Sequence, residues 1–242
     1  MSQVYIQDYL HTQGLKLPLE EVQIAYATLG AVFNLAEVKD LPENLWQAQG
    51  HGFDATAFLD ESADNNAFLR AVYAVLDTTM HRFPAKVALY MTAERQAVEF
   101  DVEAIEAAEA EPVILQRLWH NQFTLPANLN HEQHGHLLAH RAAQTGWAYV
   151  VEDAQHWLRI QELTEDECRL GFSQLLLPLC APSGAVLGLL YVSSPEAHAF
   201  DASAQAWWVA ACLTLADALY HHFPTAWWGQ QDENNDDLPT GN

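Results

Sequence analysis

Positive charge is scarce in this chain. It holds 10 lysines and arginines against 32 aspartates and glutamates, which gives a formal net charge of −22 at pH 7. Nucleic acids and anionic membrane surfaces are bound through lysine and arginine side chains, so we expect neither as a partner. Two interpretations of the acidity stay open. It keeps the protein soluble, or it forms a surface that docks on a basic partner protein or mimics DNA.

Cysteine is also scarce, with three residues in 242. Cys168, Cys180 and Cys212 form an odd set in apolar surroundings, which predicts buried free thiols rather than a disulfide framework. The first residues lack the basic segment and apolar core of a secretory signal. No apolar run approaches the roughly 18 residues that span a bilayer. These absences predict a cytoplasmic protein without a membrane-spanning segment.

Half of the residues are hydrophobic, which is ample for a packed core. Residues 1–62 are predicted to form a helical N-terminal extension. It has an amphipathic turn that ends at Gly14, a second helix that Pro18 opens, and a short third helix at 42–46. The pattern leaves open whether this extension is a separate docking subdomain or packs on the main domain.

The next segment predicts a helix, a hairpin and a second helix. Asp64 is the expected N-cap of a helix that ends at Phe83. Residues 86–91 and 96–101 are predicted to pair as a β-hairpin. The alanine- and glutamate-rich run 102–111 favours a helix, which we expect to continue over 113–119.

A further helix and three strands follow. Asn130 is placed to cap a helix over 131–145, and Gly146 to end it. A strand is predicted at 147–151. The runs 173–180 and 185–194 flank a Pro-Ser-Gly turn, which predicts an antiparallel hairpin.

The last helix is apolar on almost every face. Asp201 is its expected cap, and it ends near His222. A helix of this kind must be covered on every side, so one side is expected on the sheet and the other on a partner. The acidic tail 227–242 is predicted to be disordered.

The segment 146–194 resembles the GAF domain, a ligand-sensing relative of PAS domains. The letters that carry the resemblance are GWAYVVED, SQLLLPL and GAVLGLL. It extends over about 66–223 and implies an α+β fold, with an antiparallel sheet flanked by helices. The first and last helices would lie on one face, and a ligand pocket under inserted segments on the other. On this basis the domain spans 63–226.

In GAF domains the terminal helices often pair two copies. The resemblance therefore implies a homodimer through the helix from Asp64 to Phe83 and the helix from Asp201 to His222. A second copy would also cover the free side of the last helix.

Four histidines lie close together at 131, 134, 136 and 140. His136 and His140 are one helical turn apart, a spacing at which two imidazoles can hold Zn²⁺ or Cu²⁺. With Leu138 as the buried centre, helical phase turns His131 and His134 inward and the other two outward. The four histidines do not converge, so we predict no metal site and no cofactor.

One branch of GAF proteins reduces free methionine-R-sulfoxide with cysteine thiols. Cys168 lies near the place of one of those thiols. The carboxylates of that branch are replaced by Gln174, Tyr191 and Ser193, and its Gly-Lys-Gly-Val-Cys-Gly stretch is absent. The resemblance therefore implies a protein without enzymatic activity, and the thiol-dependent reductase is the less favoured alternative.

Aromatic residues gather where the resemblance places the pocket and its roof. A cavity lined by aromatic and a few polar side chains is the usual small-molecule site. The candidate ligand-binding residues are Trp119, His120, Trp147, Tyr149, Trp157, Cys168, Gln174 and Tyr191. Strand alternation puts Trp147 and Tyr149 on one face, expected to point to the roof. The alternative is that these side chains fill the space themselves.

Together these features predict a cytoplasmic, homodimeric sensory or regulatory protein that binds an unknown small ligand. It would signal through protein contacts made by the N-terminal helices, the acidic surface and Trp227 with Trp228. The alternative from another class is an acidic protein-interaction module with a filled pocket. A cavity among the tryptophans would favour the sensor, and a filled core the module.

Overall fold

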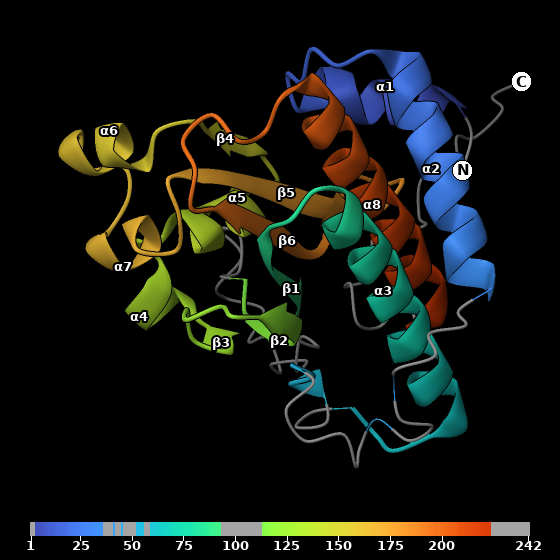
Figure 1. Cartoon of the computed structure of the whole chain (residues 1–242). Helices are drawn as coiled ribbons and strands as arrows, with labels where there is room; N and C mark the ends of the chain where they lie inside the picture. The colour runs from blue at the N-terminus through green and yellow to red at the C-terminus, as the bar shows by residue number, and fades with distance from the viewer. Residues whose placement is uncertain are drawn as a thin grey trace, which may run out of the picture.

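The computed structural model describes residues 3–35, 41, 45, 52–55, 59–92 and 113–223. Within them the chain forms a six-stranded antiparallel sheet in the order β3-β2-β1-β6-β5-β4, with helices on both faces (Figure 1). The strands are β1 Lys86–Thr92, β2 Leu115–Asn121, β3 Asn128–Leu129, β4 Tyr149–Val151, β5 Ser173–Cys180 and β6 Val186–Ser194. The helices are α1 Gln3–Thr12, α2 Leu19–Leu35, α3 Ala63–Arg82, α4 His131–His134, α5 Leu138–Thr145, α6 Ala154–Arg159, α7 Glu165–Cys168 and α8 Ala202–His222. The predicted α+β class is confirmed.

The hairpin of β5 and β6 is the centre of the sheet. Leu177 pairs with Leu190 in its register, and the turn contains Gly184 at φ +90°, a conformation that suits glycine. β6 also pairs with β1, and an added Cβ at Gly188 would lie 2.2 Å from the carbonyl oxygen of Tyr90. Glycine therefore permits the close approach of these two strands, and the predicted hairpin is confirmed.

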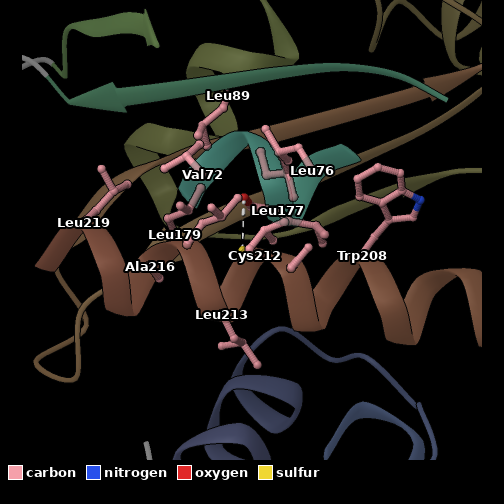
Figure 2. Packing of buried hydrophobic residues seen from close by; sticks show 14 of the residues in the cluster. Val72, Leu76, Leu89, Leu177, Leu179, Trp208, Cys212, Leu213, Ala216 and Leu219 are labelled. Carbon is pink, nitrogen blue, oxygen red and sulfur yellow. Dashed lines mark hydrogen bonds between the residues drawn. The ribbon is translucent and has the colours of Figure 1, made fainter. Parts of the chain in front are cut away.

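Helices α3 and α8 cover one face of the sheet. Their apolar side chains pack against strand residues such as Leu89 and Leu177 (Figure 2). Cys212 is fully buried in this layer, and its thiol donates to the carbonyl oxygen of Pro178 at 3.3 Å. The arrangement matches the prediction that the first and last helices of the domain share a face.

The other side of α8 is covered within the same chain by α2 and α1. Figure 2 shows Leu213 pointing away from the sheet toward the blue N-terminal ribbon. In α2, Val22, Ala25 and Leu29 are fully buried. The hydroxyl of Tyr9 in α1 donates to the carbonyl oxygen of Pro178 at 3.0 Å. Residues 3–35 thus belong to the main core, and α8 needs no second copy to cover it.

The opposite face of the sheet carries α5, α6 and α7 with a second apolar cluster. Side chains from three elements meet there: Leu138 and Ala142 from α5, Leu176 from β5, and Tyr191 from β6. All four are buried. This is the face on which the sequence predicted a ligand pocket.

One predicted helix is wrong. Residues 113–119 were expected to be helical, but β2 runs from Leu115 to Asn121 and pairs with β1 along most of its length. Hydrogen bonds to β1 and burial of Leu118 outweigh the helical propensity of the alanine-rich run before it. The predicted strand 96–101, the helices 102–111 and 42–46 (apart from Leu45) and the tail 227–242 lie outside the described residues.

The predicted helix 131–145 is interrupted. Gly135 ends α4, and Leu137 is extended at φ −71° and ψ 140° before α5 starts. The break changes the helical phase, so His140 points inward and is 1% exposed, whereas an outward orientation was predicted. The caps Asn130 and Asp201 are confirmed, but α3 is capped by Ser62 rather than Asp64.

Among the helices that the structure describes, none has the length and apolarity needed to cross a membrane.

Candidate functional site

Two predicted ligand residues form a closed pair in the core. The hydroxyl of Tyr191 donates to Oε1 of Gln174 at 2.6 Å, and both residues are fully buried. Nε2 of Gln174 donates in turn to the carbonyl oxygens of Glu167 at 2.8 Å and Gly171 at 3.1 Å. Because their side-chain polar groups are satisfied within the protein, this pair stabilises the second cluster.

The aromatic candidates do not converge on one cavity. Tyr149 and Trp157 are half-buried and meet edge to face, with ring centroids 6.3 Å apart. Trp119 belongs to the cluster on the other face and meets the ring of Tyr73 in α3 at 5.6 Å. Trp147 precedes β4 and is 68% exposed. Besides the buried Tyr191, Tyr149 and Trp157 are the aromatic candidates on the face where the pocket was expected.

Neighbouring rings fill the space above Tyr191. Phe123 packs edge-on against it at 4.9 Å, and Tyr90 is fully buried with its hydroxyl donating to the carbonyl oxygen of Pro126. Burial raises the pKa of Tyr90 to about 12, so its hydroxyl stays protonated and able to donate. This arrangement is the filled core that the sequence left open as an alternative.

His120 belongs to a cluster at the end of β2. Nε of Arg117 lies 2.5 Å from Oδ2 of Asp54, and Nε2 of His120 lies 3.9 Å from the same oxygen. Arg117 also donates to the carbonyl oxygen of Leu125 at 2.7 Å. Burial and the nearby Arg117 lower the pKa of His120, while Asp54 acts in the opposite direction. The ion pair between Arg117 and Asp54 therefore links residues 52–55 to β2.

Cys168 lines a hollow of about 440 Å³ that is bordered by residues of α6 and α7 and of the segment 169–172. Gln155, Leu158 and Arg169 contribute to its walls, and Nε2 of Gln155 donates to the Cys168 sulfur at 3.1 Å. Burial raises the pKa of the Cys168 thiol, and so does Asp153, while Arg169 opposes them. Of the eight predicted ligand residues, Cys168 is the one that lines this hollow.

Glu167 fixes the segment that carries Cys168. Its buried carboxylate accepts hydrogen bonds from the amide of Leu138 at 2.6 Å and from the hydroxyl of Thr164 at 3.0 Å. Burial raises the pKa of Glu167, and the hydrogen bonds from Thr164 and Leu138 oppose this. Glu167 was not among the residues predicted from the sequence, although Thr164-x-x-Glu167 is the pattern of a capping box.

A larger groove of about 950 Å³ lies where α2, α3 and α8 meet. Its walls include Tyr26 and Phe33 from α2, Phe68 from α3, and Asp217 from α8. The groove was not predicted from the sequence, because it depends on the packing of α2 against α8, which local patterns do not specify.

The described residues contain no group of three or more histidine, cysteine, aspartate or glutamate side chains that could hold a metal ion. His140 lies beside His131, with ring centroids 5.5 Å apart, and its Nε2 bonds to the carbonyl oxygen of Val113 at 2.8 Å. His136 is exposed on the segment between α4 and α5. The inward turn of His140 therefore separates the pair that sequence spacing suggested.

No protein-family model and no curated protein matches the chain. Among solved structures, a protein from Burkholderia vietnamiensis described as a GAF sensor is 18% identical, with a TM-score of 0.48 over 83% of this chain and 97% of that one. The GAF domain of an Acinetobacter phosphoenolpyruvate-protein phosphotransferase is 15% identical, with a TM-score of 0.48 over 87% and 97%. A third structure, described only as a GAF domain, is 12% identical, with a TM-score of 0.43 over 82% and 87%.

The fold assignment rests on the topology itself. A six-stranded antiparallel sheet has α3 and α8 on one face and the α5–α7 segment on the other. This is a GAF-like α+β fold, as the sequence resemblance predicted.

Proposed function

We propose that the protein is a regulatory module without enzymatic activity, which binds a small ligand and transmits the bound state through protein contacts. The observation that carries the proposal is the hollow beside Cys168. Its volume of about 440 Å³ suits a small molecule, since such sites typically measure about 300–1,000 Å³. Residues of α6 and α7 border it, in the region where the GAF resemblance places the pocket and its roof.

The thiols support a binding role rather than a reductase. A nucleophilic cysteine needs a lowered pKa, but burial raises the pKa of Cys180 to about 11 and that of Cys212 still higher. The pKa of Cys168 is raised as well. None of the three thiols therefore has the lowered pKa of an activated nucleophile.

The proposal includes two kinds of protein contact, one with a basic partner protein and one with a second copy of the chain. With a net charge of −22, the chain would attract a basic partner protein. The homodimer through α3 and α8 stays a prediction, as does a cytoplasmic location. Since α2 covers the far side of α8, sedimentation of the full chain at micromolar concentration is needed to test the dimer.

A second candidate function is an interaction module that binds no small ligand. The closed pair of Tyr191 and Gln174 and the rings packed above it favour this alternative, because they occupy the inner face of the sheet. The two candidate functions differ in whether the hollow at Cys168 binds a small ligand.

Native mass spectrometry of the chain purified from its own cells separates them. The expected result is a small mass retained under gentle conditions and lost on denaturation. Leu158→Trp, which places a large ring in the hollow, should lose that mass. Leu35→Trp, on an exposed part of α2, is the matched control and should keep it.

A wild-type protein without a retained mass would favour the interaction module. A mass that Leu158→Trp still retains would place the ligand elsewhere and overturn the assignment of the hollow.

A further inference from the structure

The groove between α2, α3 and α8 has the composition of a second binding site. Three helices that are distant in sequence supply its walls, and its volume is about 950 Å³. It lies among the helices that cover the α3 and α8 face of the sheet, and Cys168 and the other residues of the hollow do not line it. The groove is therefore separate from the site of the proposed function.

Aromatic rings and carboxylates line this groove together. Tyr26, Phe33 and Phe68 provide the rings, and Asp64 and Asp217 provide the carboxylates. Among the described residues that line it, none is a lysine or an arginine. The two carboxylates therefore give the groove a local negative charge.

The two histidines that line the groove have different surroundings. His222 is stacked on Phe68, with ring centroids 4.1 Å apart, and its Nε2 bonds to Oδ1 of Asn65 at 2.7 Å. Burial lowers the pKa of His222, while Asp64 opposes this shift. Burial thus disfavours the charged form of His222, whereas His221 is exposed, with its Nδ1 3.5 Å from Oδ1 of Asp217.

The carboxylate of Asp217 interacts electrostatically with Tyr26 in the aromatic wall of the groove. Tyr26 has its pKa raised to about 12, first by burial and then by Asp217. The raised pKa means that Asp217 disfavours a second negative charge on Tyr26, whereas an aromatic ring face attracts a cation. Both features favour a positive group over a negative one in this groove.

We propose that this groove binds a small organic cation, namely an amine with an apolar or aromatic body. The ammonium group would lie near Asp217 and Asp64, where both carboxylates and the aromatic faces attract it. The body would pack against Phe33 and the small side chains Ala71 and Ala218. An anion of the same shape would be repelled.

Two probes of equal shape and opposite charge test the proposal. Tryptamine and indole-3-propionate share an indole ring and a two-carbon chain, and they end in an ammonium and a carboxylate. Binding is measured by isothermal titration calorimetry of the full chain at about 0.15 M salt. At this ionic strength the Debye length is about 8 Å, so the salt screens long-range attraction. We expect tryptamine to bind and indole-3-propionate not to bind.

The charge of the groove is tested with matched variants. Asp64→Asn with Asp217→Asn should weaken tryptamine binding at least about tenfold, which corresponds to about 1.4 kcal/mol. Glu132→Gln with Glu196→Gln makes the same change in net charge at exposed positions that do not line the groove, and affinity should change less than about twofold. Equal losses in both pairs would overturn the proposal, because they would show attraction to the acidic chain as a whole.

The shape of the groove is tested at Gly30. An added Cβ there meets no heavy atom within 4 Å, so Gly30→Leu should occupy the groove without a clash in the core. This variant should lose tryptamine binding, whereas Ala27→Leu, on an exposed part of the same helix, should bind like the wild type. Undiminished binding by Gly30→Leu, or binding of indole-3-propionate with similar affinity, would contradict the proposal.

The two proposed sites are distinguished by Leu158→Trp. It should leave tryptamine binding unchanged even if it abolishes the ligand mass at Cys168. Loss of tryptamine binding in this variant would show that the amine occupies the hollow and not the groove. Dissociation of a dimer by tryptamine in sedimentation experiments would identify the groove as a contact between copies and would also overturn the proposal.

Discussion

The carboxylate of Glu167 and the amide of Leu138 lie 2.6 Å apart, although 29 residues separate them in sequence. A side chain of α7 therefore caps the N-terminus of α5, which has no cap from its own preceding residue. The amide of Ala139 and the hydroxyl and amide of Thr164 donate to the same carboxylate. A negative charge at a helix N-terminus is favourable, so this one side chain joins the roof segment to the second cluster.

We expect Glu167→Ala to lower the free energy of unfolding by about 3 kcal/mol, because it leaves buried amides without an acceptor. Glu165→Ala in the same helix removes an exposed ion pair with Arg169 and should cost less than about 1 kcal/mol. Urea unfolding followed by circular dichroism measures both. Equal losses in the two variants would show that the buried cap contributes no more than a surface pair.

The sequence was sufficient for elements whose signals are local. The β5–β6 hairpin follows from two β-rich runs around a glycine turn, and the caps Asn130 and Asp201 follow from residue type and position. The helix predicted at 113–119 failed because strand pairing with β1, a long-range contact, decided the outcome.

The candidate site was harder to predict for a physical reason. Strand alternation gives the face of a residue only when the extent of the strand is known, and β4 begins at Tyr149, after Trp147. Helical phase likewise failed at His140, because an extended residue at Leu137 resets it. The groove depends on how α2 packs against α8, and no periodicity in a single segment specifies that contact.

Tyr9 tests whether the N-terminal helices are part of the fold. Its buried hydroxyl donates to Pro178 and lies 3.5 Å from the sulfur of Cys212. Tyr9→Phe should lower the free energy of unfolding by about 1 kcal/mol, since it removes a buried hydrogen bond while the Cys212 thiol still donates to the carbonyl oxygen of Pro178. Tyr149→Phe is the control, because Tyr149 makes no hydrogen bond through its hydroxyl within the described residues, and it should change stability by less than about 0.5 kcal/mol. If Tyr9→Phe lowered the stability of only a separate, less stable unfolding transition, residues 1–62 would unfold independently of the rest of the chain.

Stability should fall in mildly acidic solution. Burial lowers the pKa of His120, His140 and His222 below the ordinary value of 6.5. Below pH 6.5 the unfolded chain therefore binds more protons than the folded chain, and the free energy of unfolding declines as the pH falls through the folded pKa values. Glu167 has the opposite sign, because burial raises its pKa and its protonation favours the folded state.

Urea unfolding at pH 7.5, 6.5 and 5.5 measures this decline. His140→Gln keeps a donor that can reach the carbonyl oxygen of Val113 but does not titrate, so its decline should be shallower than that of the wild type. A wild-type stability that is constant or rises over this interval would contradict the prediction.

Two glycines with open space around them should respond to alanine in opposite directions. Gly30 lies inside α2 with helical backbone angles, so Gly30→Ala should raise the free energy of unfolding by about 0.5–1 kcal/mol. Gly14 has φ +65°, so Gly14→Ala should lower it by about 1 kcal/mol, because a Cβ disfavours that conformation. Thermal unfolding of both variants gives the sign, and destabilisation by Gly30→Ala would mean that the groove cannot accommodate even a methyl group.

The three thiols should differ sharply in their reactivity toward iodoacetamide. Cys212 is fully buried and Cys180 is partly buried, and burial raises the pKa of both thiols well above its usual range. Cys168 is partly exposed at the hollow, although its pKa is raised too. In native protein at pH 7.5 we expect slow alkylation of Cys168 and none of the other two, whereas urea should expose all three. Peptide mass spectrometry assigns each site. Alkylation of native Cys168 faster than that of the urea-unfolded thiol would reveal an activated nucleophile, and would restore the thiol-dependent enzyme as the better explanation of the hollow.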